Sequence, residues 1–178
     1  IDLNVPAVLK SYDFSIEENT QNAMRELACN LQGISVERVK SEMDKLLLSN
    51  HPDLLILMSK LGICKYIIPT FASLLVIEQE NPNHIYNVGL HTIHTIKMLN
   101  SKCEDEAFKE VDELVDFSLL KNERDLLMLK WTMLMHDMGK PIKKTIDEIG
   151  IAHFKMHELA SLDIAKDYFA KMKFDNYT

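Results

Sequence analysis

Apolar residues recur at helical spacing through the first part of the chain. Between residues 15 and 33 they fall on one face of a helix, which a capping box at Ser15–Glu18 is expected to begin and Gly33 to end. Ser35 is expected to cap a second helix, which the sequence Asn50-His51-Pro52 then breaks. The pattern therefore predicts two amphipathic helices separated by a short turn.

Two shorter helices are predicted next, at residues 54–61 and 71–77, and an apolar connector at residues 63–68 joins them. No cluster of polar residues interrupts these four helices. We therefore expect residues 1–80 to form one helical, bundle-like domain.

A turn cluster at residues 79–83 marks the expected start of a second domain, residues 81–178. Asn87 is expected to cap a helix that runs to about Leu99. Residues 101–123 are acidic and only weakly periodic, so they are predicted to form an amphipathic connector with a solvated charged face.

The last third of the chain is predicted to hold two helices and a turn. An apolar helix is expected at about 124–138, and residues 142–152 carry the signals of a short hairpin or loop. The last helix is expected to carry His153 and His157 one turn apart. With only five glycines and five prolines in the chain, the predicted fold class is all-α.

Composition narrows the class of protein. The chain has 178 residues and a net charge of −7, which argues against a protein that holds nucleic acid by its overall field, although a local basic patch remains compatible. The odd number of cysteines suggests free thiols in a reducing compartment, and neither a membrane span nor a signal peptide is evident. We expect a cytoplasmic protein without a membrane partner. The cysteines are Cys29, Cys64 and Cys103.

The candidate chemistry begins with His136 and Asp137, which follow ten largely apolar residues and precede the helix-stopping sequence Gly139-Lys140-Pro141. A buried helix that ends in an imidazole and a carboxylate can present both to one cavity. Asp137 has no evident local charge partner, and an unpaired interior carboxylate costs several kcal/mol, so it needs a cation. The alternative is a histidine–aspartate pair that frays into solvent at a helix end.

Other predicted elements supply further histidines. His91 and His94 lie near each other on one helix, and His153 and His157 lie on the last one. Imidazole and carboxylate ligands without thiolates suit Mn, Fe, Ni, Zn or Mg in an open, catalytic type of site. His136, Asp137 and one histidine from an earlier helix could hold one such divalent metal ion. The remaining histidines could hold a second metal or bind a phosphate.

A metal held in this way would acidify a bound water and neutralise phosphoryl oxygens, which is the chemistry of phosphoester hydrolysis. Lys140 could reach a phosphate. Alternatively, it is a cation that interacts favourably with the C-terminus of the preceding helix.

The order His91, then His136-Asp137, then Gly-Lys-Pro resembles the HD superfamily of all-α, metal-dependent phosphohydrolases. Residues 81–92, 135–141 and 153–158 together resemble the HD domain appended to bacterial tRNA nucleotidyltransferases, the CCA-adding enzyme and poly(A) polymerase family. The sequence before residue 70 is similar to the helical neck that follows the catalytic head in that family.

The resemblance implies that His91, His136 and Asp137 are metal ligands, that His157 is a fourth ligand or a phosphate contact, and that His153 is a weaker phosphate or second-metal candidate. It implies hydrolysis of a phosphomonoester or a 2′,3′-cyclic phosphodiester. In the mechanism expected, Asp137 or His157 handles the proton of the attacking water, while Lys140 or His153 steadies the phosphate. It also implies a tRNA partner for the full-length protein.

The chain departs from the family in two respects. It lacks the β-sheet head that nucleotide addition needs, so we expect no nucleotidyl transfer from these residues. We also expect the chain to end before the family's final metal-binding aspartate, so that the HD-type domain is truncated. Asp163, Asp167 or Asp175 could replace that carboxylate.

A second function remains open. The chain could be a non-catalytic helical module that positions tRNA or mediates contacts in a homo-oligomer. Under that hypothesis the histidine–aspartate motif is unused. A signalling HD domain that acts on nucleotides fits less well, because the neck-like first half has no place in it.

Overall fold

The computed structural model describes residues 16–77, 86–100 and 120–175. In this part of the chain the fold is all-α, as predicted, and the only strands are a two-residue pair. The helices are α2 (Glu18–Leu27), the 3-10 helix η1 (Ala28–Gly33), α3 (Val36–Leu48), α4 (Leu54–Lys60), α5 (Cys64–Ile67), α6 (Phe71–Leu74), α7 (Val88–Met98), α9 (Glu123–Met135), α10 (Lys140–Lys143) and α11 (His157–Lys171), and the strands are β1 (Thr145–Ile146) and β2 (Ala152–His153).

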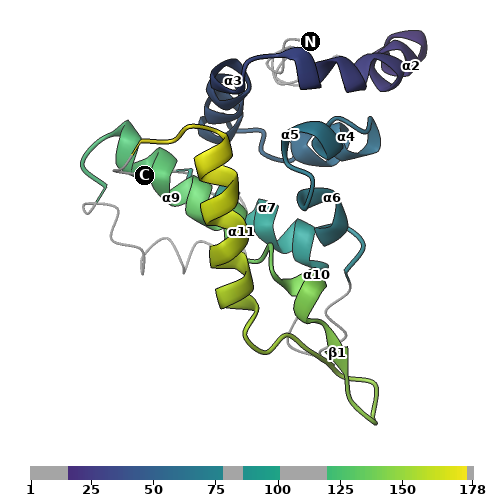
Figure 1. Ribbon diagram of the computed structural model, residues 1–178, viewed down its shortest axis with the longest axis vertical. Helices are drawn as coiled ribbons and strands as arrows, with labels where there is room; N and C mark the ends of the chain where they lie inside the picture. Colours follow the sequence, from purple (N-terminus) through teal and green to yellow (C-terminus); the bar gives the residue numbers. More distant parts are fainter. Residues whose placement is uncertain (1–15, 78–85, 101–119, 176–178) are drawn as a thin grey trace.

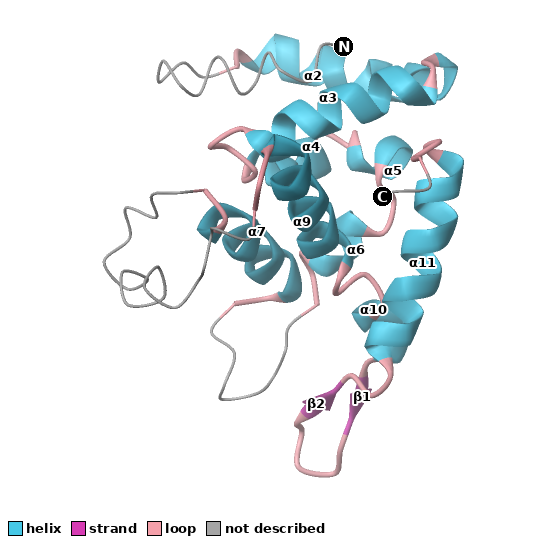
Figure 2. Cartoon of the chain, turned by 90° about the vertical axis from the view of Figure 1, so that its left-hand side faces the viewer, coloured by secondary structure: helices cyan, strands magenta, loops and turns pink. Residues whose placement is uncertain are grey.

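The helices stack along one long axis (Figure 1). Helices α2 and α3 occupy one end, and the β1–β2 hairpin projects from the opposite end in both views (Figure 2). Between these ends α9 packs against α3, α7 and α11, and α10 packs against α11. None of the described helices combines the length and the apolar character needed to cross a membrane.

Local signals explain where two of the helices begin. The Ser35 side chain accepts a hydrogen bond from the Arg38 N–H at the start of α3, and the Asn87 side chain accepts one from the Leu90 N–H at the start of α7. Both caps confirm the prediction, because each oxygen satisfies a backbone donor that the first helical turn leaves open.

Two predictions for the N-terminal helices are wrong in detail. The cap of α2 is Glu17, whose carboxylate accepts from the Thr20 N–H. Ser15, where the predicted capping box begins, lies outside the described residues. Residues 63–68 are not a simple connector, because Cys64–Ile67 form the helical turn α5. The helix predicted at residues 71–77 is also shorter than expected and ends at Leu74. The apolar side chains of α5 are buried, and tertiary packing therefore decides this segment's conformation.

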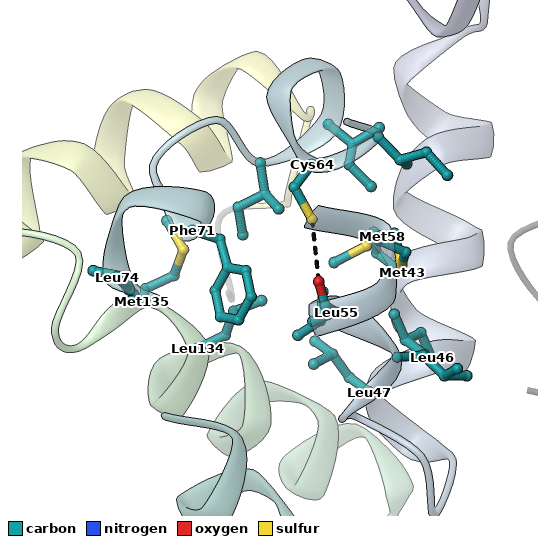
Figure 3. Packing of buried hydrophobic residues seen from close by; sticks show 14 of the residues in the cluster. Met43, Leu46, Leu47, Leu55, Met58, Cys64, Phe71, Leu74, Leu134 and Met135 are labelled. Atoms are coloured by element: carbon teal, nitrogen blue, oxygen red, sulfur yellow. Dashed lines mark hydrogen bonds between the residues drawn. The ribbon is translucent and has the colours of Figure 1, made fainter. Parts of the chain in front are cut away.

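One apolar cluster joins the two predicted domains. It contains Met43, Leu55 and Phe71 from the N-terminal helices together with Leu134 and Met135 from α9. Figure 3 shows Leu134 and Met135 beside Phe71, and the buried Cys64 thiol donating to the Leu55 carbonyl oxygen. The expected boundary at residues 79–83 lies outside the described residues, as does most of the predicted connector at 101–123.

Candidate metal centre

Four elements bring the predicted site residues together near one end of α9. His91 lies on α7, His136 and Asp137 form the turn that follows α9, and Lys140 and His157 are the first residues of α10 and α11. Helix α9 ends here because the chain tightens: the Met138 N–H bonds to the Met135 carbonyl oxygen and the Lys140 N–H bonds to that of Asp137. The turn aims the Asp137 side chain inward.

The Asp137 carboxylate is the centre of this group. Its Oδ2 atom lies 3.1 Å from His136 Nε2, 3.9 Å from His91 Nε2 and 2.9 Å from Lys140 Nζ. Its Oδ1 atom lies 3.3 Å from His157 Nε2. One ligand atom from each of His91, His136 and Asp137 lies within 4.8 Å of the others, close to the separations of about 3–4 Å among ligands bonded at roughly 2.1 Å to one ion.

Backbone carbonyl groups fix two of the imidazole rings. His136 Nδ1 lies 2.6 Å from the Met133 carbonyl oxygen, and His157 Nδ1 lies 2.7 Å from that of Phe154. A carbonyl oxygen only accepts, so each Nδ1 carries the proton and donates it. A neutral ring then directs the lone pair of Nε2 at Asp137. This is the orientation in which proteins hold metal-binding histidines.

These contacts fit a cation in the centre of the group. Two imidazole lone pairs that face one carboxylate repel it unless a metal ion, or a second proton on each ring, supplies positive charge. The Oδ2 atom of Asp137 is buried and makes no hydrogen bond of good geometry, although three nitrogens surround it. Imidazole nitrogen and carboxylate oxygen are also ligands that Mn, Fe, Ni or Zn accepts.

The site is buried on its carboxylate side and open on its imidazole side. The Asp137 side chain is 2% exposed, whereas those of His91, His136 and His157 are 35%, 30% and 29% exposed. Burial raises the pKa of Asp137, but the contacts with His136 and Lys140 outweigh it and lower the pKa to about 2. Burial lowers the pKa of His136, and Asp137 more than offsets this, so the net shift is upward. The carboxylate is therefore ionised.

Lys140 is the local charge partner of Asp137 that the sequence pattern did not reveal. It lies three residues after the aspartate and is itself 7% exposed. Its ammonium group also lies 5.4 Å from the centre of the Phe154 ring. Lys140 thus neutralises part of the buried charge, and its predicted contact with a phosphate stays a prediction.

The prediction that His153 lies on the last helix is wrong. It lies in strand β2, where its Nε2 atom is 2.8 Å from Asp147 Oδ2. Met156 adopts a left-handed conformation with φ of 63°, so the chain turns sharply and α11 begins only at His157. His153 is therefore on the hairpin and not beside His157 on one helix face.

The remaining candidates lie away from Asp137. The His94 ring stacks on Tyr86, with ring centres 4.4 Å apart. In the described part of the chain, the group of potential ligands contains none of the three aspartates that could replace the family's final carboxylate. Asp175 pairs with Arg124 at the opposite end of α9, and Asp163 and Asp167 are exposed on α11.

Two residues beside the site, Gly139 and Ser161, were not predicted from the sequence as site residues. The Gly139 N–H donates a hydrogen bond of 2.8 Å to the buried Ser161 hydroxyl oxygen. The signals available were a small residue directly after the histidine–aspartate pair and a serine among the apolar positions of α11. Neither signal predicts that α11 packs against the turn after α9.

The N-terminal part of the chain matches a known family. Residues 13–75 match a family model described as the probable RNA- and SrmB-binding site of polymerase A. The match covers η1 and α2–α6, and it ends before the helix that carries His91. No curated protein matches the chain.

Proposed function

We propose that this chain is part of a tRNA-nucleotidyltransferase-like protein, in which an RNA-binding helical region precedes a metal-dependent phosphohydrolase site of the HD type. The family match at residues 13–75 supports the first part of the proposal. The second part rests on one observation: His91 on α7 and His136 in the turn after α9 both lie against the buried carboxylate of Asp137.

In this proposal His91, His136 and Asp137 hold a divalent cation, and His157 approaches from the other oxygen of Asp137. The cation would supply Lewis acidity, which acidifies water and neutralises charge on phosphoryl oxygens. The ligand types are compatible with Mn, Fe, Ni, Zn or Mg. The open imidazole side faces solvent and would admit a phosphomonoester or a 2′,3′-cyclic phosphodiester.

Three side chains would divide the remaining work. When its Nε2 is not bonded to the cation, His157 is the better candidate for accepting the proton of an attacking water, because its ring is partly exposed and its Nδ1 proton is committed to a carbonyl oxygen. Asp137 is buried and paired with the Lys140 ammonium, so it would orient the imidazoles. Lys140 would steady a phosphate only by leaving Asp137, since its ammonium lies 2.9 Å from that carboxylate.

The test is hydrolysis of p-nitrophenyl phosphate and of a 2′,3′-cyclic nucleotide with Mn²⁺, Ni²⁺ or Mg²⁺. We expect Asp137→Ala to lose activity by at least roughly 100-fold, because it removes the only buried carboxylate of the described residues. Asp175→Ala is the matched control and should keep full activity, because that carboxylate is exposed. Absence of hydrolysis with all three cations, or an active Asp137→Ala variant, would refute the proposal.

A second candidate function is a non-catalytic RNA-positioning module. The specific observation in its favour is that the family match covers only the N-terminal helices. The two functions separate in one pair of measurements: binding of tRNA and hydrolysis of phosphoesters. RNA binding that persists in Asp137→Ala, together with no hydrolysis by the unmodified chain, would favour the module.

A further inference from the structure

A hydrogen bond joins the turn that follows Asp137 to α11, one helical turn after that helix begins. The Gly139 N–H donates a hydrogen bond of 2.8 Å to Ser161 Oγ, and the Ser161 side chain belongs to a residue only 4% exposed. Ser161 lies four residues after His157 on the same helix, so the two side chains lie on the same face of α11. The hydrogen bond therefore joins the segment that carries Asp137 to the segment that carries His157.

Gly139 lets these two segments approach more closely than any other residue would allow. A Cβ atom on residue 139 would lie 2.6 Å from the Ser161 nitrogen and 2.8 Å from the Ala160 Cβ, and it would also collide with the His157 carbonyl oxygen. The backbone atoms among these neighbours cannot swing aside as a flexible side chain does. A larger residue would thus have to move the start of α11.

The position of His157 depends on where α11 starts. The residue before it, Met156, is in the left-handed conformation and provides no side-chain cap for the helix. The hydrogen bond from Gly139 to Ser161 supplies a fixed point one turn later. From this start, His157 Nε2 reaches to 3.3 Å from Asp137 Oδ1.

We propose that Ser161, together with Gly139, is a positioning residue that sets His157 against Asp137 and so makes His157 the fourth protein group of the cation site. This inference rests on the proposed function for the identity of the site, but its geometric content does not. Ser161 itself lies on the far side of the turn and would act through His157. Outer groups that orient metal ligands in this way typically change metal affinity by 10- to 100-fold when they are removed.

The first test is Mn²⁺ affinity, measured by calorimetric titration of the unmodified chain and of Ser161→Ala. We expect at least a tenfold loss in Ser161→Ala, a smaller loss in Ser161→Cys, which keeps a weak acceptor, and a larger loss in Gly139→Ala. Ser59→Ala on α4 is the matched control, because it removes a buried hydroxyl oxygen from a helix that carries no site residue, and it should bind as the unmodified chain does. Circular dichroism verifies that each variant keeps its helical content.

The second test separates positioning from general packing. In a His157→Ala background, Ser161→Ala should cost less than a further twofold in Mn²⁺ affinity, because its effect passes through the missing ring. A crystal structure of Ser161→Ala should show the distance from His157 Nε2 to Asp137 Oδ1 lengthened beyond 3.3 Å.

The proposal is overturned if Ser161→Ala binds Mn²⁺ as tightly as the unmodified chain, if its loss is undiminished without His157, or if the crystal structure shows His157 unmoved. If the unmodified chain binds no divalent cation, the proposed function fails instead. In that case the crystal structure of Ser161→Ala still decides whether Ser161 positions His157.

Discussion

The two halves of the molecule bury different kinds of side chain. Within residues 16–77 every residue that is buried as a whole is apolar, whereas the described residues after them also include polar and charged residues that are buried as a whole. Both halves are helical and share one apolar cluster, so burial of apolar area stabilises each in the same way. The buried polar residues are Thr92, Lys130, Asp137, Lys140 and Ser161.

This difference separates stability from function. A buried charge costs free energy unless it is paired, and a chain that needed only a stable core would place an apolar residue there. Three of the five buried polar residues, Asp137, Lys140 and Ser161, lie in or directly against the candidate site. The comparison suggests that substitutions in the N-terminal helices change the free energy of unfolding, while those around Asp137 change cation binding.

The largest expected effect is on the free energy of unfolding, when an apolar side chain of the N-terminal helices is truncated. Leu55→Ala should reduce the free energy of unfolding by about 2–5 kcal/mol, because the Leu55 side chain is fully buried and its removal leaves a cavity. Urea denaturation measures the loss. Leu159→Ala, at a position 48% exposed on α11, is the matched control and should change stability by less than about 0.5 kcal/mol.

The Leu55→Ala variant also tests whether the N-terminal helices influence the candidate site. Where it is still folded, its Mn²⁺ affinity should equal that of the unmodified chain. A tenfold or greater loss of Mn²⁺ affinity would show that residues 16–77 also shape the site. Stability and cation binding would then not be separated between the two halves.

A second effect concerns Lys130, a buried cation where the two halves meet. Its ammonium donates to the Leu47 carbonyl oxygen at the end of α3 and to the Asn100 side chain, which are neutral acceptors. Burial lowers the pKa of Lys130 to about 8 from the model-compound value of 10.5. Between these values the unfolded chain binds more protons than the folded one, so the contribution of Lys130 to stability rises with pH.

This contribution can be isolated with Lys130→Met, which keeps the length of the side chain and removes its charge. From pH 8 to pH 10.5 the stability of the unmodified chain should increase relative to the variant, by about 3 kcal/mol at most. Urea denaturation at several pH values measures the difference. A difference that stays constant or falls with pH would contradict the burial of this ammonium group.

A third effect is the stabilisation of the folded chain by the bound cation. Mn²⁺ at 100 times its dissociation constant should increase the free energy of unfolding by about 2.7 kcal/mol, because the ion binds the folded state. Thermal unfolding measures this as a rise in Tm. The rise should persist in Leu159→Ala and disappear in His136→Ala, and an equal rise in both variants would place the ion elsewhere.

The smallest effect is expected at the surface. Arg124 and Asp175 form an ion pair in which both side chains are more than half exposed. Arg124→Ala should therefore lower the free energy of unfolding by less than about 1 kcal/mol and leave Mn²⁺ affinity unchanged. A larger loss, measured by urea denaturation, would show that this end of α9 carries more of the stability than its exposure implies.

The sequence predicted the features that depend on local signals. Ser35 and Asn87 cap their helices because a short polar side chain before an apolar run satisfies open backbone donors wherever it occurs. The pairing of His91 with His136-Asp137 followed from the residue types and from the resemblance to the HD superfamily. The structure places these three together.

Features that depend on tertiary contacts were not predictable in the same way. The left-handed Met156 separates His153 from His157, although a four-residue spacing is also what one helix face would show. Nothing in the sequence marks Lys130 and Lys140 as buried, and only the packing of α9 and α10 buries them. The contact between Gly139 and Ser161 likewise appears only when α11 meets the turn after α9.

Calorimetric titration with Mn²⁺ decides the claim that His91, His136 and Asp137 hold a divalent cation. The unmodified chain should bind one ion per molecule, Asp175→Ala should bind it equally well, and Asp137→Ala should bind it at least roughly 100-fold more weakly. No binding by the unmodified chain, or equal binding by Asp137→Ala, would contradict the claim.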